Sequence, residues 1–158
     1  MSQHIIWKSA AAGLLTLAFS LAGFAGTSGA GSTEGPVLQE HPAMEFPELP
    51  SSGKKCRIDD AYYFIYEFTE KPRLGTAILR IRISDGDENR STDFTVLGRS
   101  DMPSMAGSHD SGDQEFKLNN KGDYLLPVNI VMPGEWEVKL TFKRGDTIIS
   151  RGAFRFDV

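Results

Sequence analysis

The chain has 158 residues, enough for one domain with a buried core, and carries a formal net charge of −4. From residue 54 onward 16 basic residues are balanced by 17 acidic ones, so this part has no electrostatic footprint for nucleic acid. The single cysteine, Cys56, excludes an intrachain disulfide. A lone thiol is either free, bonded to another molecule or bound to a metal, and it is most often a small buried hydrophobe.

Residues 1–25 have the layout of a secretory signal. Lys8 precedes an uncharged run rich in Ala, Leu and Phe, and small residues follow this run. A basic start, an apolar middle and small residues direct export and cleavage. The apolar run, residues 9–25, is also close to the minimum length of a membrane-spanning helix, so an uncleaved anchor is the alternative. Both interpretations predict a periplasmic or other extracytoplasmic location, with membrane contact only if the segment stays attached.

Residues 26–53 predict a flexible acidic linker. They contain four glutamates, no Lys or Arg, and many Gly, Ser and Pro residues. Such a composition buries too little apolar surface to fold by itself. The sequence therefore predicts a signal or anchor at 1–25, a linker at 26–53 and one domain at 54–158.

Within this domain the apolar pattern is that of β-strands. Apolar and polar side chains alternate along most segments, as in strands with one buried face. The predicted strands are 61–68, 78–84, 94–97, 115–118, 124–132, 136–143 and 154–158. Turn signals such as Arg144-Gly145-Asp146 separate them. About seven short antiparallel strands predict an all-β, immunoglobulin-like or fibronectin-like sandwich, and the missing cysteine pair argues against the antibody type.

The connection from Gly98 to Gly112 is too long for a hairpin, and it carries soft metal donors. Met102, Met105 and His109 lie within it, and Pro103 stiffens the segment between the methionines. Thioether sulfur selects Cu(I), and imidazole also suits copper. These residues predict a copper-binding loop. The alternative is that the methionines are plugs that close one end of the sandwich, because Met fills irregular apolar gaps.

Met132 is a fourth candidate ligand. It ends the apolar stripe of the segment 124–132, which makes it a core residue. The Pro133-Gly134 turn would still bring its sulfur toward the loop if both lie at one end of the sandwich. Convergence of the sulfur and nitrogen atoms favours a metal site, whereas methionines turned into the core favour the plug interpretation.

Four short motifs occur in a fixed order along the domain. They are Pro72-Arg73-Leu74-Gly75, Met102-Pro103-Ser104-Met105, Gly122-Asp123-Tyr124 and the run from Met132 to Val138. In this respect the chain resembles the YtkA-like family, which includes FixH-like proteins, from about Tyr62 to its C-terminus. The resemblance implies an immunoglobulin-type sandwich outside the cytoplasmic membrane. For some members it also implies copper delivery or cytochrome oxidase maturation. This chain lacks the additional Met or His beside the methionine motif, and its nearest imidazole is His109.

Two functions from different classes remain. The first is an exported module that binds Cu(I) through Met102, Met105, His109 and Met132 and delivers it to an exported or membrane-bound acceptor. The second is a structural β-sandwich that docks onto a membrane or exported assembly, with the loop methionines as apolar contacts. The sequence has no nucleophile elbow, phosphate-binding loop or haem-attachment motif, and the predicted domain has a single histidine. We therefore expect no enzyme.

Overall fold

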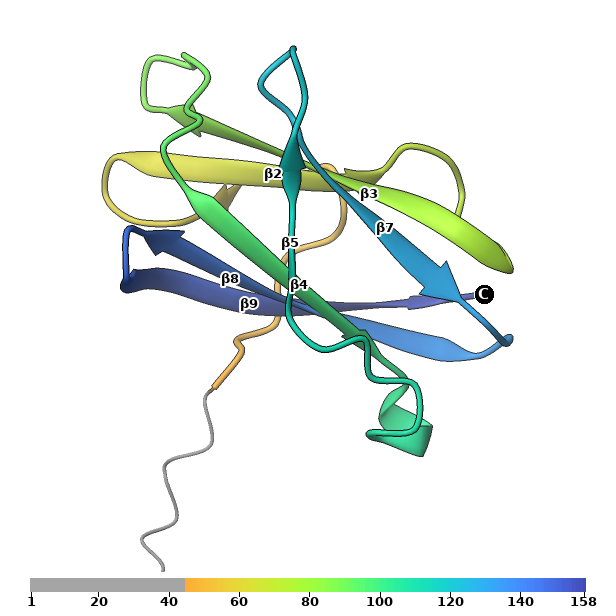
Figure 1. Ribbon diagram of the computed structural model, residues 1–158. Coiled ribbons are helices and arrows are strands. Elements are labelled where there is room, and N and C mark those ends of the chain that lie inside the picture. Colours follow the sequence, from red (N-terminus) through yellow and green to blue (C-terminus); the bar gives the residue numbers. More distant parts are fainter. Residues whose placement is uncertain (1–44) are drawn as a thin grey trace, which may run out of the picture. The chain divides into compact units, whose positions relative to one another are not determined.

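The computed structural model describes residues 45–158, which form two antiparallel β-sheets (Figure 1). The elements are β1 (Cys56–Arg57), β2 (Tyr62–Phe68), β3 (Gly75–Asp85), β4 (Thr95–Asp101), η1 (Pro103–Met105), β5 (Gln114–Glu115), β6 (Lys117–Leu118), β7 (Tyr124–Ile130), β8 (Glu135–Arg144) and β9 (Thr147–Asp157). The larger sheet has the order β1-β2-β3-β7-β6, and the smaller sheet has the order β5-β4-β8-β9. The predicted all-β, sandwich-like architecture is confirmed at this level.

The N-terminal predictions fall mostly outside the described residues. The signal or anchor at 1–25 and the linker up to residue 44 lie in the part that the structure does not describe. Within residues 45–158, no helix has the length and apolar character needed to span a membrane.

The core lies between the sheets and follows from the two-residue alternation of the long strands. The buried side chains of β3 and β8 are Leu79, Ile81, Ile83, Trp136, Val138, Leu140 and Phe142. Phe64 of β2 meets Phe142 of β8 across the core, with ring centroids 4.4 Å apart. Full burial of one such side chain contributes about 1.5–3 kcal/mol. The alternation in the sequence therefore fixes which face of each sheet turns inward.

The segment 115–118 is not the single strand that its sequence predicts. Its first part pairs with β4 in the smaller sheet, and its second part pairs with β7 in the larger sheet. Phe116, between them, is buried, and its N–H bonds the carbonyl of Val96 at 2.9 Å. The chain therefore crosses between the sheets at Phe116. The prediction is wrong because so short an alternation cannot reveal a change of partner.

Gly98 lies inside β4, which continues to Asp101, so the predicted start of the loop at Gly98 is wrong. A Cβ atom at Gly98 would lie 2.5 Å from Cδ2 of Leu126 and 2.7 Å from Cε2 of Phe116. Glycine is needed here because the facing sheet approaches the backbone closely. The loop instead begins at Met102.

β9 begins at Thr147 and not at residue 154 as predicted. The register between β8 and β9 shifts between Phe142 and Lys143. Such an irregularity breaks the two-residue alternation on which the prediction depends.

Residues 45–53, which the sequence places in the linker, contact the outer edge of β9. Leu49 donates its N–H to the carbonyl of Ala153 at 2.8 Å, and Ala153 donates its N–H to the carbonyl of Pro47 at 2.9 Å. A Cβ atom at Gly152 would lie 2.7 Å from Cγ of Leu49, so the glycine makes room for the leucine. The described domain therefore begins before residue 54, and this segment covers part of an open strand edge.

The two ends of the sandwich are closed by different residues. The tyrosine end consists of Tyr62, Arg90, Phe94, Asp123, Tyr124 and Arg144. The methionine end consists of Met102, Met105, His109, Met132 and Trp136, with Leu74 and Val131 beside them. In Figure 1 the turn between β8 and β9 marks the tyrosine end, and η1 and the C-terminus mark the methionine end. All four predicted metal ligands therefore lie at the same end.

Candidate metal centre

The loop that carries three of the four predicted ligands turns sharply after β4. The Oδ1 atom of Asp101 accepts the N–H of Met102 at 2.8 Å, and its Oδ2 atom accepts the N–H of Gly107 at 2.9 Å. Pro103 begins η1, in which the N–H of Met105 bonds the carbonyl of Met102 at 2.9 Å. Gly107 has a φ of +80°, which favours glycine. One carboxylate thus closes the base of the turn.

A second group of contacts fixes the return of the loop to β4. Arg99 binds both carboxylate oxygens of Asp110, with Nε 2.7 Å from Oδ1. These hydrogen bonds from Arg99 lower the pKa of Asp110. Ser111 donates its N–H to the carbonyl of Ser100 at 2.9 Å and accepts the N–H of Ser100 at Oγ, also at 2.9 Å. Both the start of the loop and its return are therefore hydrogen-bonded to residues of β4.

The two methionines of the loop occupy different environments. Met102 is only 3% exposed and belongs to the core, whereas Met105 is 43% exposed on η1. A Cβ atom at Gly134 would lie 3.0 Å from Cε of Met102, so the end of this side chain packs on the β7–β8 turn. The position of Met102 is the one expected of a plug, and the position of Met105 is not.

His109 and Met132 meet at Trp136. The rings of His109 and Trp136 have centroids 6.3 Å apart, and the indole Nε1 of Trp136 donates to the carbonyl of Met132 at 3.1 Å. Met132 is half-buried and packs against the core. Met102 reaches the same β7–β8 turn. The fold therefore gathers Met102, His109 and Met132 around the start of β8, while Met105 lies on the exposed side of the loop.

The donor atoms at this end are three thioethers and one imidazole. These soft donors suit Cu(I) in preference to hard cations. Within residues 45–158, no group of three His, Cys, Asp or Glu side chains is arranged to hold a metal ion. The carboxylate of Asp101, at the start of the loop, already accepts two backbone N–H groups. A metal ion at this end would therefore need the thioether sulfur atoms as its main ligands.

Sequence reasoning missed Asp101 and the position of Trp136 beside His109. An Asp directly before a Met-Pro pair is a weak signal, because Asp side chains commonly accept nearby backbone N–H groups in turns. The contact of Trp136 with His109 had no signal, because it depends on how the loop folds over β8. The four side chains that the sequence singles out as ligands, those of Met102, Met105, His109 and Met132, all lie at this end.

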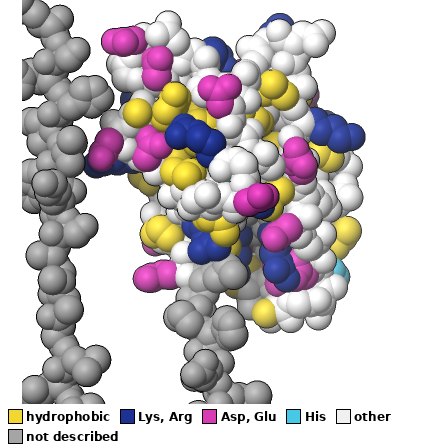
Figure 2. All heavy atoms as spheres, turned by 60° about the vertical axis from the view of Figure 1, so that its left-hand side comes forward, with side chains coloured by type: hydrophobic (Ala, Val, Ile, Leu, Met, Phe, Trp, Pro, Cys, Tyr) yellow, Lys and Arg dark blue, Asp and Glu magenta, His cyan; other side chains and the backbone are white. Residues whose placement is uncertain are grey.

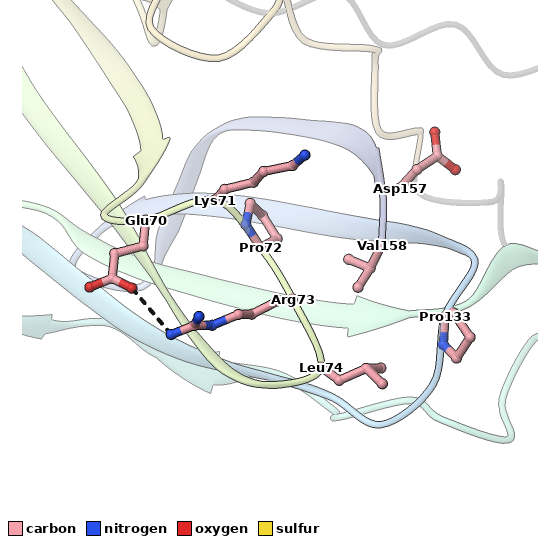
Figure 3. A pocket seen from close by; sticks show the side chains of 8 residues that line it. All are labelled: Glu70, Lys71, Pro72, Arg73, Leu74, Pro133, Asp157 and Val158. Carbon is pink, nitrogen blue, oxygen red and sulfur yellow. Dashed lines mark ion pairs between the residues drawn. The ribbon is translucent and has the colours of Figure 1, made fainter.

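An apolar hollow of about 730 Å³ lies beside the candidate metal centre (Figure 3). It opens between the β2–β3 loop, the β7–β8 turn and the C-terminus, and Pro72, Leu74, Pro133 and Val158 line its apolar part. Leu74 is 56% exposed, and Val131 on the adjacent turn is 63% exposed. This surface is not among the features predicted from the sequence.

Cys56 lies at the start of β1, where it is buried. Its Sγ is 3.6 Å from the carbonyl oxygen of Lys54, and burial raises the pKa of the thiol. Burial with a raised pKa describes a thiol that packs as a small hydrophobe.

The molecular face drawn in Figure 2 shows acidic and basic side chains interspersed with apolar ones. Neither sign of charge forms a continuous patch on this face.

No family model matches the chain, and no curated protein sequence matches it either. The resemblance to the YtkA-like family therefore stays a prediction.

Proposed function

We propose that this protein is an exported immunoglobulin-like module of the YtkA-like kind that binds Cu(I) at its methionine end and passes it to an acceptor protein. It acts without catalysing a reaction. The secretory pattern of residues 1–25 supports export, and the two antiparallel sheets agree with the proposed fold class.

One observation carries the proposal. The loop with Met102, Met105 and His109 and the turn with Met132 lie well apart in the chain, yet the structure places them at one end of the sandwich. A plug needs apolar side chains only, whereas an imidazole against Trp136 adds a nitrogen donor to the three sulfurs. This donor set has the chemistry of a Cu(I) site.

The different exposures of the ligands suit transfer. Met102 and Met132 lie on the inner side of the site, while Met105 stands on η1 in contact with solvent. A partner that carries its own thioether or thiolate ligands can approach from the side of Met105. Exchange of ligands from that side would move the ion without opening the core.

The proposal is tested by an anaerobic Cu(I) titration of the full chain against a chromogenic competitor. The variant replaces the three methionines by Leu and His109 by Gln, because Leu keeps the volume of Met at a cost below about 1.5 kcal/mol per site. We expect one equivalent to bind to the wild-type chain and none to the folded variant. Equal binding by both chains would contradict the proposal.

The matched control is the Leu118→Ala variant. Leu118 is an exposed apolar residue of β6, away from the methionine end. Its Cu(I) binding should equal that of the wild-type chain.

A second candidate function is docking onto an exported or membrane-bound assembly. The exposed Leu74 and Val131 beside the apolar hollow favour it, because large exposed apolar residues that gather at one place commonly mark contact surfaces. A photoreactive residue at Val131, tested in the producing cell, should then form a discrete crosslink. The same probe at Ile148, which is exposed beside the β8–β9 turn, is the control. Absence of a specific crosslink at Val131 would argue against docking at this end.

A further inference from the structure

Asp101 occupies the junction between β4 and the loop that carries the candidate ligands. Its two carboxylate oxygens accept N–H groups from opposite sides of the turn, at Met102 and at Gly107. The turn between these two residues contains η1 and therefore Met105. One side chain thus bonds both ends of the turn that contains the two methionines of the loop.

The side-chain contacts elsewhere in the loop hold other parts of it. The Arg99–Asp110 pair and the backbone bonds between Ser100 and Ser111 hold the return of the loop to β4. Within the turn, the N–H groups of Met105 and Ser108 bond the carbonyls of Met102 and Met105 at 2.9 and 3.0 Å. Hydrogen bonds to a charged acceptor are stronger than these neutral ones, so loss of the Asp101 carboxylate removes the strongest restraint at the base of the turn.

We propose that Asp101 is a positioning residue of the Cu(I) site, which keeps Met102 directed into the core while Met105 stays at the surface. This inference rests on the proposed function. Asp101 does not coordinate the ion, because its oxygens are hard donors that already bind backbone N–H groups. A site whose ligands are held in place before binding loses less conformational entropy when the ion arrives.

An electrostatic role makes a different prediction from a positioning role. If Asp101 acted only by attracting a cation, any nearby carboxylate would contribute in the same way. Asp113 provides this comparison, because it is exposed near the return of the loop to β4. The Asp113→Asn variant removes the same charge but none of the hydrogen bonds that close the turn.

The experiment measures the Cu(I) affinity of the full chain and of the Asp101→Ala, Asp101→Asn and Asp113→Asn variants by competitor titration. We expect Asp101→Ala to weaken binding by about tenfold, which corresponds to roughly 1.4 kcal/mol. Asp101→Asn should lie between this variant and the wild type, since its amide oxygen can accept one of the two N–H groups. Asp113→Asn should bind like the wild type.

A spectroscopic measurement separates positioning from a general loss of structure. The Cε methyl signals of Met102 and Met105 are followed by NMR as one equivalent of Cu(I) is added. Both should shift in the wild type, whereas the Met105 signal should shift less in a folded Asp101→Ala chain.

Equal Cu(I) affinity of Asp101→Ala and wild type would overturn the role of Asp101 alone. An equal loss in Asp113→Asn would also overturn it, because charge would then explain the effect. Failure of the wild-type chain to bind Cu(I) would overturn the proposed function, and with it this role.

Discussion

The tyrosine end and the methionine end close the same sandwich by different chemistry. At the tyrosine end, Arg90 pairs with the carboxylate of Asp123 at 2.5 Å, and the hydroxyl of Tyr124 donates to the carbonyl of Phe94 at 3.0 Å. At the methionine end the imidazole of His109 lies against the indole of Trp136, and three methionines lie at the same end. Directional polar contacts hold both ends, but the methionine end also carries soft sulfur donors, which the tyrosine end lacks. The proposed function therefore assigns Cu(I) binding to the methionine end.

The largest expected effect at the methionine end comes from Trp136→Ala. Trp136 is 1% exposed and supports both His109 and the turn at Met132. Its loss should lower the free energy of unfolding by about 3–5 kcal/mol, as for other large buried aromatics. Urea denaturation measures the change. A loss below 1 kcal/mol would show that the indole is not an anchor of this end.

The next largest effect is expected for residues 45–53, which contact β9 and belong to neither end of the sandwich. Deletion of residues 1–53 removes the packing of the half-buried Leu49, the backbone hydrogen bonds of Leu49 and Pro47 with Ala153, and the hydrogen bond from Tyr66 to Pro50. We expect a loss of about 2–4 kcal/mol in stability, because the leucine packing and these hydrogen bonds are lost, and no change in Cu(I) affinity. Deletion of residues 1–44 is the control, so that the difference between the two deletions measures the contribution of residues 45–53. A weakened Cu(I) site in the longer deletion would contradict the separation of these regions.

Arg90→Ala tests the tyrosine end. Burial acts to raise the pKa of Asp123, but the hydrogen bond and ion pair with Arg90, together with Asn119 and the charge of Arg80, lower this pKa below its usual value. The side chain of Asp123 is only 7% exposed, so removal of Arg90 leaves a buried carboxylate without its cation. The free energy of unfolding at pH 7 should fall by about 2–3 kcal/mol.

The loss in free energy of unfolding caused by Arg90→Ala should become smaller as the pH falls. The lowered pKa of Asp123 means that its stabilising contribution in the wild type is present above about pH 4 and is lost as the pH falls through the folded-state pKa. In the Arg90→Ala variant Asp123 is still buried, so protonation of its carboxylate removes the cost of burying a charge. The difference between the two chains should therefore shrink from pH 7 to pH 4. Arg73→Ala removes an exposed pair with Glu70 and should show no such trend. A deficit that is constant with pH would contradict this account.

Tyr124→Phe gives the smallest effect. The hydroxyl of Tyr124 donates to the carbonyl of Phe94 and accepts the N–H of Phe94 at 3.3 Å. Its removal should cost about 1 kcal/mol, the usual net contribution of hydrogen bonds in this range, and thermal unfolding measures it. Cu(I) affinity should not change. A change in affinity would show that the two ends are coupled.

Much of the fold was predictable because burial imposes a two-residue alternation on long strands. The segments of β3, β7 and β8 were found for this reason. The crossing at Phe116 and the glycine at position 98 were missed, since both depend on contacts with the opposite sheet. The early start of β9 was hidden by the shift in register at Phe142. The local alternation of apolar and polar residues therefore reveals where strands lie but not which strands they pair with.

The sequence predicts which residues form the candidate site but not how they are arranged, and the site itself stays a prediction. Ligand chemistry alone singled out Met102, Met105, His109 and Met132. Their separation into buried and exposed members depends on the turn closed by Asp101 and on the packing of Met102 against Gly134. These are tertiary contacts, which leave no periodic signal in the sequence.

The most direct test of the account is X-ray absorption spectroscopy of the full chain loaded with one equivalent of Cu(I). The account predicts sulfur scatterers from thioethers together with nitrogen scattering from one imidazole. In the His109→Gln variant the imidazole scattering should disappear while sulfur remains. A first shell of only oxygen and nitrogen atoms, or a spectrum unchanged by this substitution, would contradict the assignment of the methionine end as the copper site.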